Sequence, residues 1–236
     1  IITVANNDYI KVTIPEGWNI DQVALKLKEK DLINIKTFSG LCMNIAFIES
    51  MGFSGIPSLE GFLYPETYFL GSNQTEKQII KTMVDQFKKV ISLEDISNNK
   101  YNFSLHEIIT LASIVQGESM LEEEMKTIAS VFYNRITKNM FLDANATIQY
   151  IIPGKNRRLR NKDLEIENPY NTYKNKHLPP GPINSPGISA IRATLEPEKT
   201  NYIYFVKENI NSRKHIFSSN IRAHEKARKI YLKSLK

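Results

Sequence analysis

One glutamate occupies a position where a carboxylate is costly. At about 100° per residue, Glu118 lies about 20° from Leu111 and about 40° from Ile114, so it continues the apolar stripe of a predicted helix. Burial disfavours the charged form of a carboxyl group and raises its pKa, as a general acid working near neutral pH requires. Gly117 beside it would leave the helix end open to a substrate. The alternative is that the helix has already ended and Glu118 is a solvated or capping residue.

Arg135 makes a similar case on the next predicted helix, residues 121–138. It lies about 20° from Ile128 on the apolar stripe of that helix. A buried guanidinium needs a carboxylate or several carbonyl groups as partners. We therefore predict that Arg135 is paired, either in a structural salt bridge or at a substrate.

Other catalytic patterns are weaker or missing. A two-carboxylate glycosidase would need a partner for Glu118, and Glu66 and Asp143 are the candidates. The sequence contains no Gly-rich phosphate loop, Gly-x-Ser-x-Gly elbow or His-Glu-x-x-His helix. Tyrosines that could stack on sugar rings, but that could equally be packing residues, are Tyr64, Tyr68, Tyr133, Tyr150, Tyr170 and Tyr173.

The elements around these residues predict an α+β fold with two domains. Residues 9–14 alternate like a half-buried strand, and residues 20–32 follow with helical spacing. This small α/β unit should end at residue 56, with residues 57–68 as a structured connection. Residues 57–236 should then form a mixed helix and strand domain.

Helix boundaries in the larger domain are marked by capping boxes. Thr75 with Gln78, and Ser104 with Glu107, each precede an apolar periodic run. The helix after Ser104 is apolar on nearly all sides and should be buried. Further predictions, listed in chain order, are irregular structure over 139–187, a strand over 202–206 and a basic helix from 220.

Composition indicates a folded chain. Of 236 residues, 42% are hydrophobic and 24% charged, and no apolar run reaches the roughly 18 residues of a membrane span. Because the sequence opens on Ile1, we expect that a leader, an anchor or a flexible start preceded it. The lone Cys42 should fill core space, and the four histidines are too scattered for a zinc site, so we expect no metal or other cofactor.

The charge balance favours an anionic partner. Lys and Arg number 31 against 25 Asp and Glu, a net charge of +6, and positive residues gather at 155–162 and 213–236. Anionic lipid headgroups, nucleic acid and the acidic peptides of a cell wall all fit, as does a solvated basic surface. No nucleic-acid-binding motif is present, so we expect no nucleic-acid partner.

Six ordered segments resemble the signature blocks of the YceG-like endolytic murein transglycosylases. They are residues 59–68 (LEGFLYPETY), 111–118 (LASIVQGE), 129–135 (ASVFYNR), 169–173 (PYNTY), 178–183 (LPPGPI) and 202–206 (YIYFV). The front end, with Ile14-Pro15-Glu16-Gly17-Trp18, is similar to the LysM-like subdomain of that family. The resemblance covers nearly the whole chain.

The resemblance implies cleavage of the β-1,4 bond between N-acetylmuramic acid and N-acetylglucosamine, leaving 1,6-anhydro-muramyl ends, with Glu118 as catalytic acid and then base. A lytic transglycosylase needs only one carboxyl group. Two positions depart from the family pattern: Gln116 stands where some members have a second acid, and Asn145 where an Asp is common. Candidate substrate-binding residues are Asn134, Arg135, Tyr170, Asn171, Thr172 and Tyr173.

The resemblance also implies a setting. The partners would be peptidoglycan glycan strands and cell-wall synthases. The protein would be held at the cell inner membrane by an anchor absent from this sequence, with the catalytic domain on the outer side. The alternative in another class is a non-catalytic peptidoglycan-binding protein of the wall-synthesis machinery, in which Glu118 is merely structural.

Overall fold

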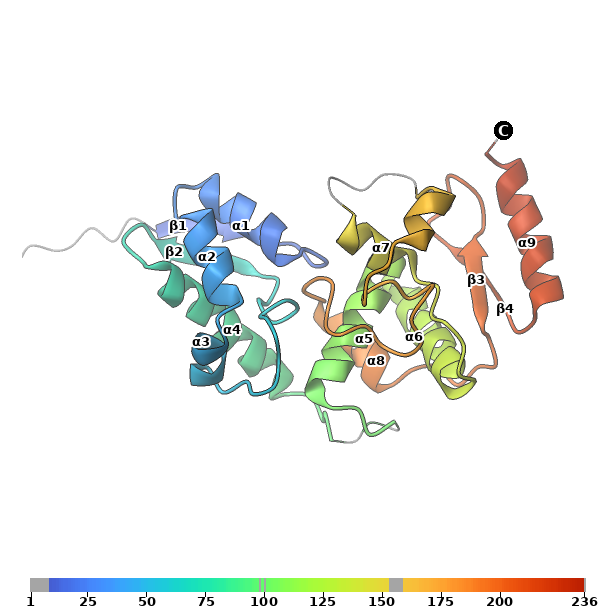
Figure 1. Ribbon diagram of the computed structural model, residues 1–236, viewed down its shortest axis with the longest axis horizontal. Helices are drawn as coiled ribbons and strands as arrows, with labels where there is room; N and C mark the ends of the chain where they lie inside the picture. Colours follow the sequence, from blue (N-terminus) through green and yellow to red (C-terminus); the bar gives the residue numbers. More distant parts are fainter. Residues whose placement is uncertain (1–8, 98, 100, 153–158, 236) are drawn as a thin grey trace, which may run out of the picture. The chain divides into compact units, whose positions relative to one another are not determined.

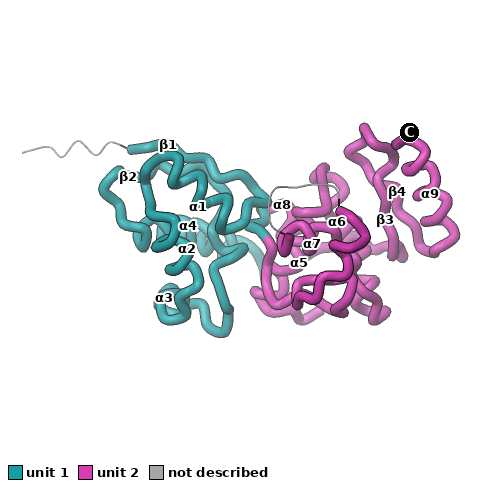
Figure 2. Tube along the Cα trace, turned by 45° about the horizontal axis from the view of Figure 1, so that its top comes forward, with its two compact units in different colours: residues 1–95, 184–187 teal, residues 96–183, 188–236 magenta. Residues whose placement is uncertain are grey.

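The computed structural model describes residues 9–97, 99, 101–152 and 159–235. The chain forms two compact units (Figure 2). Unit 1 comprises Ile1–Asp95 with Asn184–Gly187, and unit 2 comprises Ile96–Ile183 with Ile188–Lys236. Both units combine helices with a two-stranded antiparallel sheet, which confirms the α+β class.

The sheet of unit 1 joins two strands that are far apart in sequence. Strand β1 (Tyr9–Thr13) pairs antiparallel with β2 (Thr67–Gly71), in a register that sets Tyr9 opposite Gly71. The predicted strand at residues 9–14 is confirmed. Its inward side chain at Val12 is buried while its neighbours face outward, as the alternation indicated.

Helices make up most of the remaining regular structure in the described part of unit 1 (Figure 1). They are α1 (Ile20–Lys28), α2 (Ile35–Cys42), α3 (Ile45–Ser50) and α4 (Glu76–Ile91). The predicted capping box of Thr75 and Gln78 starts α4. Helix α1 ends before the predicted residue 32, because Asp31 takes a positive φ of 53° that no helix continues.

The boundary of the first unit differs from the prediction. Residues 57–68 were expected to connect two domains, yet Leu59, Phe62 and Leu63 are buried in unit 1. Phe62 packs between the rings of Phe53 and Phe87, with centroids 4.9 and 5.1 Å away. The reason is long-range: β2 completes the sheet begun by β1, so the unit cannot close at residue 56. The buried thiol of Cys42 fills core space in this unit, as predicted.

Unit 2 is built around α5 (Leu105–Glu118), whose residues from Ile108 to Val115 are all buried. The capping box of Ser104 and Glu107 starts this helix, as predicted. Helices that pack against α5 are α6 (Glu122–Thr137), α7 (Asn145–Ile151) and α8 (Ile188–Leu195). Because other helices enclose α5, apolar residues can cover nearly every side of it.

The rest of unit 2 is a hairpin-like sheet and a basic helix. Strand β3 (Tyr204–Lys207) pairs antiparallel with β4 (His215–Ser218), and α9 (Ile221–Lys233) packs against both. Strand β3 therefore begins two residues after the start predicted at residue 202. Between α6 and α8 the regular elements are short, namely α7 and the 3₁₀ turn Asn161–Glu165. Of the basic run 155–162, residues 155–158 lie outside the described part of the chain.

Candidate active site

Glu118 is the last residue of α5, and its side chain reaches the start of another helix. Its Oε1 accepts a hydrogen bond of 2.7 Å from the backbone N–H of Ala146. Ala146 is the second residue of α7, and Ala144 before it has no side chain that could cap the helix. Glu118 therefore caps α7 from outside, while the adjacent Gly117 is exposed.

Two opposing effects set the protonation of Glu118. Burial raises the pKa of its carboxyl group from the ordinary 4.5 to about 7, and the backbone N–H groups of Ala146 and Asn145 limit this rise. The N–H groups favour the carboxylate because they carry the positive end of the α7 dipole. Near neutral pH the group can therefore donate a proton and take one back.

The start of α7 is held by Arg135. Its Nη1 lies 2.7 Å from Oδ2 of Asp143, two residues before α7, and also donates to the carbonyl oxygens of Phe141 and Leu142. Its Nε donates to the carbonyl oxygen of Ile203, at 2.7 Å. The prediction that Arg135 is paired is confirmed, with both kinds of partner present. The bonds hold Asp143 at a φ of 49°, where the chain turns into α7.

Thr172 fastens the same turn from the other side. Its Oγ1 accepts from the N–H of Ala144 at 3.0 Å and lies 2.9 Å from Oγ1 of Thr147. Its carbonyl oxygen accepts from the N–H of Asp143. Thr172 is only 1% exposed, so its contacts position α7.

Two asparagines of the predicted set also bond within the protein. Asn171 is fully buried, and its Nδ2 donates to the carbonyl oxygens of Leu164 and Ile166. Asn134 donates through Nδ2 to the carbonyl oxygens of Thr200 and Tyr202, just before β3. These amides hold loops in place, and we assign them to positioning.

Tyr173 lies at the candidate site itself. Its hydroxyl donates to Oδ1 of Asn145 at 2.8 Å. Burial raises the pKa of Tyr173, the charges of Glu118 and Asp143 raise it further, and the charge of Arg135 opposes this rise. Asn145, the position that departs from the family pattern, thus sits between Tyr173 and the Glu118 carboxyl.

Tyr170 packs against another tyrosine of unit 2. Its ring centroid is 5.1 Å from that of Tyr150, and a Cβ added to Gly181 would approach its hydroxyl to 3.2 Å. The glycine in the segment 178–183 therefore allows close approach to this tyrosine.

The structure brings together Glu118, Asn145, Tyr173, Asp143 and Arg135. The other candidate carboxylate, Glu66, belongs to unit 1, where it is exposed and accepts from the N–H of Thr67. Sequence reasoning missed the N–H pair at the start of α7. The available signal was a short helix whose preceding residue, an alanine, cannot cap it. Among the described residues, no group of three His, Cys, Asp or Glu side chains could hold a metal ion.

Comparison with known proteins agrees with the motifs around this carboxyl group. The model of the YceG-like family matches residues 2–230. The chain belongs to the YceG-like family. A crystal structure of a yceG-like protein from Listeria monocytogenes superposes with a TM-score of 0.84 at 35% identity, covering 92% of this chain and 75% of that one.

Curated relatives carry a functional name. A protein of Bacillus subtilis named endolytic murein transglycosylase is 36% identical over 242 residues, which are 95% of this chain and 66% of the relative. A protein of Streptococcus pneumoniae with the same name is 31% identical over 91% of this YceG-like chain. The chain thus spans just under two thirds of the Bacillus relative and 43% of the pneumococcal one.

Proposed function

We propose that this protein cleaves peptidoglycan glycan strands as an endolytic lytic transglycosylase, with Glu118 as general acid and then general base. The observation that carries the proposal is the Glu118 carboxyl group, half-buried at the end of α5 with its pKa raised to about 7. Relatives named endolytic murein transglycosylase, at 30–36% identity over more than nine tenths of the chain, support the substrate class.

The reaction needs a proton to move twice. Protonated Glu118 gives its proton to the glycosidic oxygen between N-acetylmuramic acid and N-acetylglucosamine, and the bond from the muramyl C1 to that oxygen breaks. The Glu118 carboxylate then takes the proton of the muramyl C6 hydroxyl, whose oxygen bonds to C1. A 1,6-anhydro-muramyl end forms, no water is consumed, and Glu118 is again protonated.

The surroundings of Glu118 fit a one-carboxyl mechanism. The neighbouring carboxylate, Asp143, is ion-paired through Oδ2 with the guanidinium of Arg135, which disfavours its use as a nucleophile. A retaining hydrolase would need a second, nucleophilic carboxylate about 5–5.5 Å from the acid. Tyr173 and the exposed Asn145 remain to contact the N-acetyl sugars. Asn145 offers a hydrogen bond but no charge at that position.

The cellular setting is part of the proposal. We propose that the protein acts on the outer side of the inner membrane, where its glycan substrate lies, held there by a membrane anchor and beside the synthases that make the strands. None of the helices in the described ranges is long and apolar enough to cross a membrane.

The test is product analysis on purified peptidoglycan. Wild-type protein should release anhydro-muramyl ends, and Glu118→Gln should lower the rate by about 10²–10⁴-fold, the usual contribution of general acid–base catalysis. Glu123→Gln is a matched control, because Glu123 is an exposed glutamate in the same unit. Reducing muramyl ends from the wild type would show hydrolysis instead. Strand binding without product would favour the non-catalytic alternative.

A further inference from the structure

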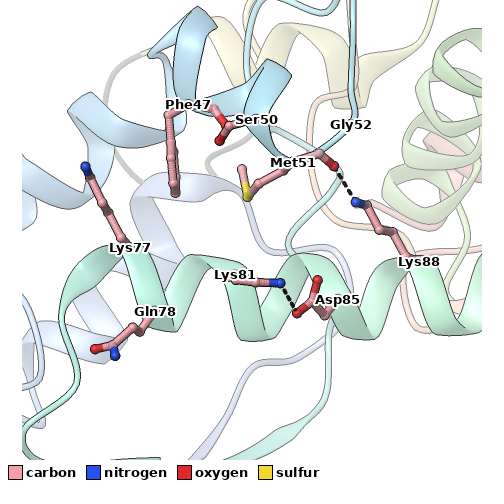
Figure 3. Close-up of a pocket in the computed structure, with 9 residues that line it drawn as sticks. All are labelled: Phe47, Ser50, Met51, Gly52, Lys77, Gln78, Lys81, Asp85 and Lys88. Atoms are coloured by element: carbon pink, nitrogen blue, oxygen red, sulfur yellow. Dashed lines mark hydrogen bonds and ion pairs between the residues drawn. The ribbon is translucent and has the colours of Figure 1, made fainter.

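A hollow of about 550 Å³ lies in unit 1, between α3 and α4. Figure 3 shows Phe47 directed from α3 towards α4 and the side chain of Met51, just after α3, running across the hollow, with Lys77 and Lys88 at either side. A volume of this size is typical of small-ligand sites, which combine apolar walls with a few polar groups. The residues identified as the candidate active site all belong to unit 2.

The lining of this hollow carries excess positive charge. Lys77, Lys81 and Lys88 stand against the single carboxylate of Asp85. Asp85 is engaged by Lys81 at 2.7 Å, and no carboxylate in the described part of the chain forms an ion pair with Lys77 or Lys88. Two hollows of similar size in unit 2 lack this positive excess. One is lined by two acidic and two basic residues, and the other by two acidic residues and one basic residue.

The cations are arranged in a row beside an apolar floor. Lys77 holds its ammonium 5.9 Å from the ring centroid of Phe47. Lys88 donates to the carbonyl oxygen of Met51 and lies 5.3 Å from the ring centroid of Phe53, which fixes one end of the hollow. Lys77 and Lys88 are eleven residues apart on one helix, or roughly 16 Å along its axis.

We propose that this hollow binds a short acidic peptide of the cell wall, carried on the glycan strand that unit 2 cleaves. The carboxylates would lie along the lysine row, and the aliphatic parts would cover Phe47 and Met51. A neutral glycan would leave the excess of two positive charges uncompensated, whereas a peptide with two carboxylates would match it. The inference rests on the proposed function for its substrate, but its site is separate from Glu118.

Binding can be measured with a defined probe. The probe is N-acetylmuramyl-L-alanyl-D-glutamate with both carboxylates free, and its matched control is the same compound with both carboxylates amidated. Titration calorimetry on the full chain should show tighter binding of the free acid, and added salt should weaken it. Equal affinity for the two compounds would overturn the proposal.

Variants assign the binding to this hollow. The double variant Lys77→Gln/Lys81→Gln removes two exposed cations and should weaken binding of the free acid about 2- to 30-fold. The matched control Lys26→Gln/Lys28→Gln makes the same charge change on α1 of the same unit and should bind like wild type. Equal losses in both variants would mean a general charge effect and would refute the site.

Activity separates this inference from the proposed function. On strands whose peptides have been removed, Lys77→Gln/Lys81→Gln should form anhydro ends at the wild-type rate. On strands that carry peptides, its KM should rise with kcat unchanged. If wild type forms no anhydro ends, the proposed function fails while the calorimetry still decides the peptide site. An unchanged KM on peptide-bearing strands would contradict the site even if Glu118 is catalytic.

Discussion

The replacement Glu118→Gln should change how the stability of unit 2 depends on pH. The pKa of Glu118 rises from 4.5 to about 7 on folding, chiefly through burial. The folded protein therefore holds this proton more tightly than the unfolded chain, and the favourable contribution is complete below about pH 4.5. It is lost progressively as the pH rises to about 7.

The magnitude follows from the shift. A rise from 4.5 to about 7, at about 1.4 kcal/mol per pKa unit, corresponds to about 3 kcal/mol between low and high pH. Glutamine keeps an oxygen that can accept from the N–H of Ala146 and does not titrate. The variant should match wild type near pH 4.5 and exceed it by up to about 3 kcal/mol at pH 8.

Hydrogen exchange of peptides from α5 and α7, read by mass spectrometry at the two pH values, measures the local stability. The single tryptophan, Trp18, lies in unit 1, so its fluorescence is an internal check that the other unit is unaffected. The exposed Glu123→Gln should change stability by less than about 1 kcal/mol at either pH. Parallel pH dependence in wild type and Glu118→Gln would show that burial does not govern this carboxyl group.

Further predictions concern other groups. Because the proposed mechanism requires the acid form of Glu118 for bond cleavage, kcat/KM for anhydro-end formation should fall about tenfold per pH unit above about pH 7, as a pH–rate profile would show. Arg135→Ala should lower the unfolding free energy by about 3–5 kcal/mol in urea titration, because it leaves Asp143 and three carbonyl oxygens without their partner; a loss below 1 kcal/mol would contradict this. Tyr173→Phe should cost less than about 1.5 kcal/mol of stability, since it removes one hydrogen bond, and should raise KM for glycan strands. Burial raises the pKa of the Cys42 thiol, so iodoacetamide should label it only on unfolding, as mass spectrometry would show.

Local signals in the sequence predicted local structure well. Capping boxes at Thr75 and Ser104 marked the starts of α4 and α5, because a cap and the residue three places on are fixed by one turn of backbone. Helices α2 and α3 were not predicted. Each has eight residues or fewer, so their apolar period is too short to stand out.

Contacts between residues far apart in the chain account for what could not be predicted from the sequence. The stripe position of Arg135 required a partner, but nothing in its spacing pointed to the carbonyl oxygen of Ile203, 68 residues away. The pairing of β1 with β2 likewise moved the boundary of unit 1 far beyond residue 56. Both depend on how the chain closes over distance, which periodicity does not encode.

The alternatives for Glu118, buried acid or capping residue, prove to describe one arrangement. The carboxyl group is buried enough to raise its pKa, and it also caps α7 through the N–H of Ala146. In the proposed mechanism Glu118 acts as acid and then as base, and the cap bears on both roles. Burial alone would make the carboxylate too unfavourable to form, whereas the start of α7 stabilises it as the proton leaves. Because Arg135 and Thr172 hold the turn that begins α7, they help to set the proton affinity of Glu118 without touching its carboxyl group.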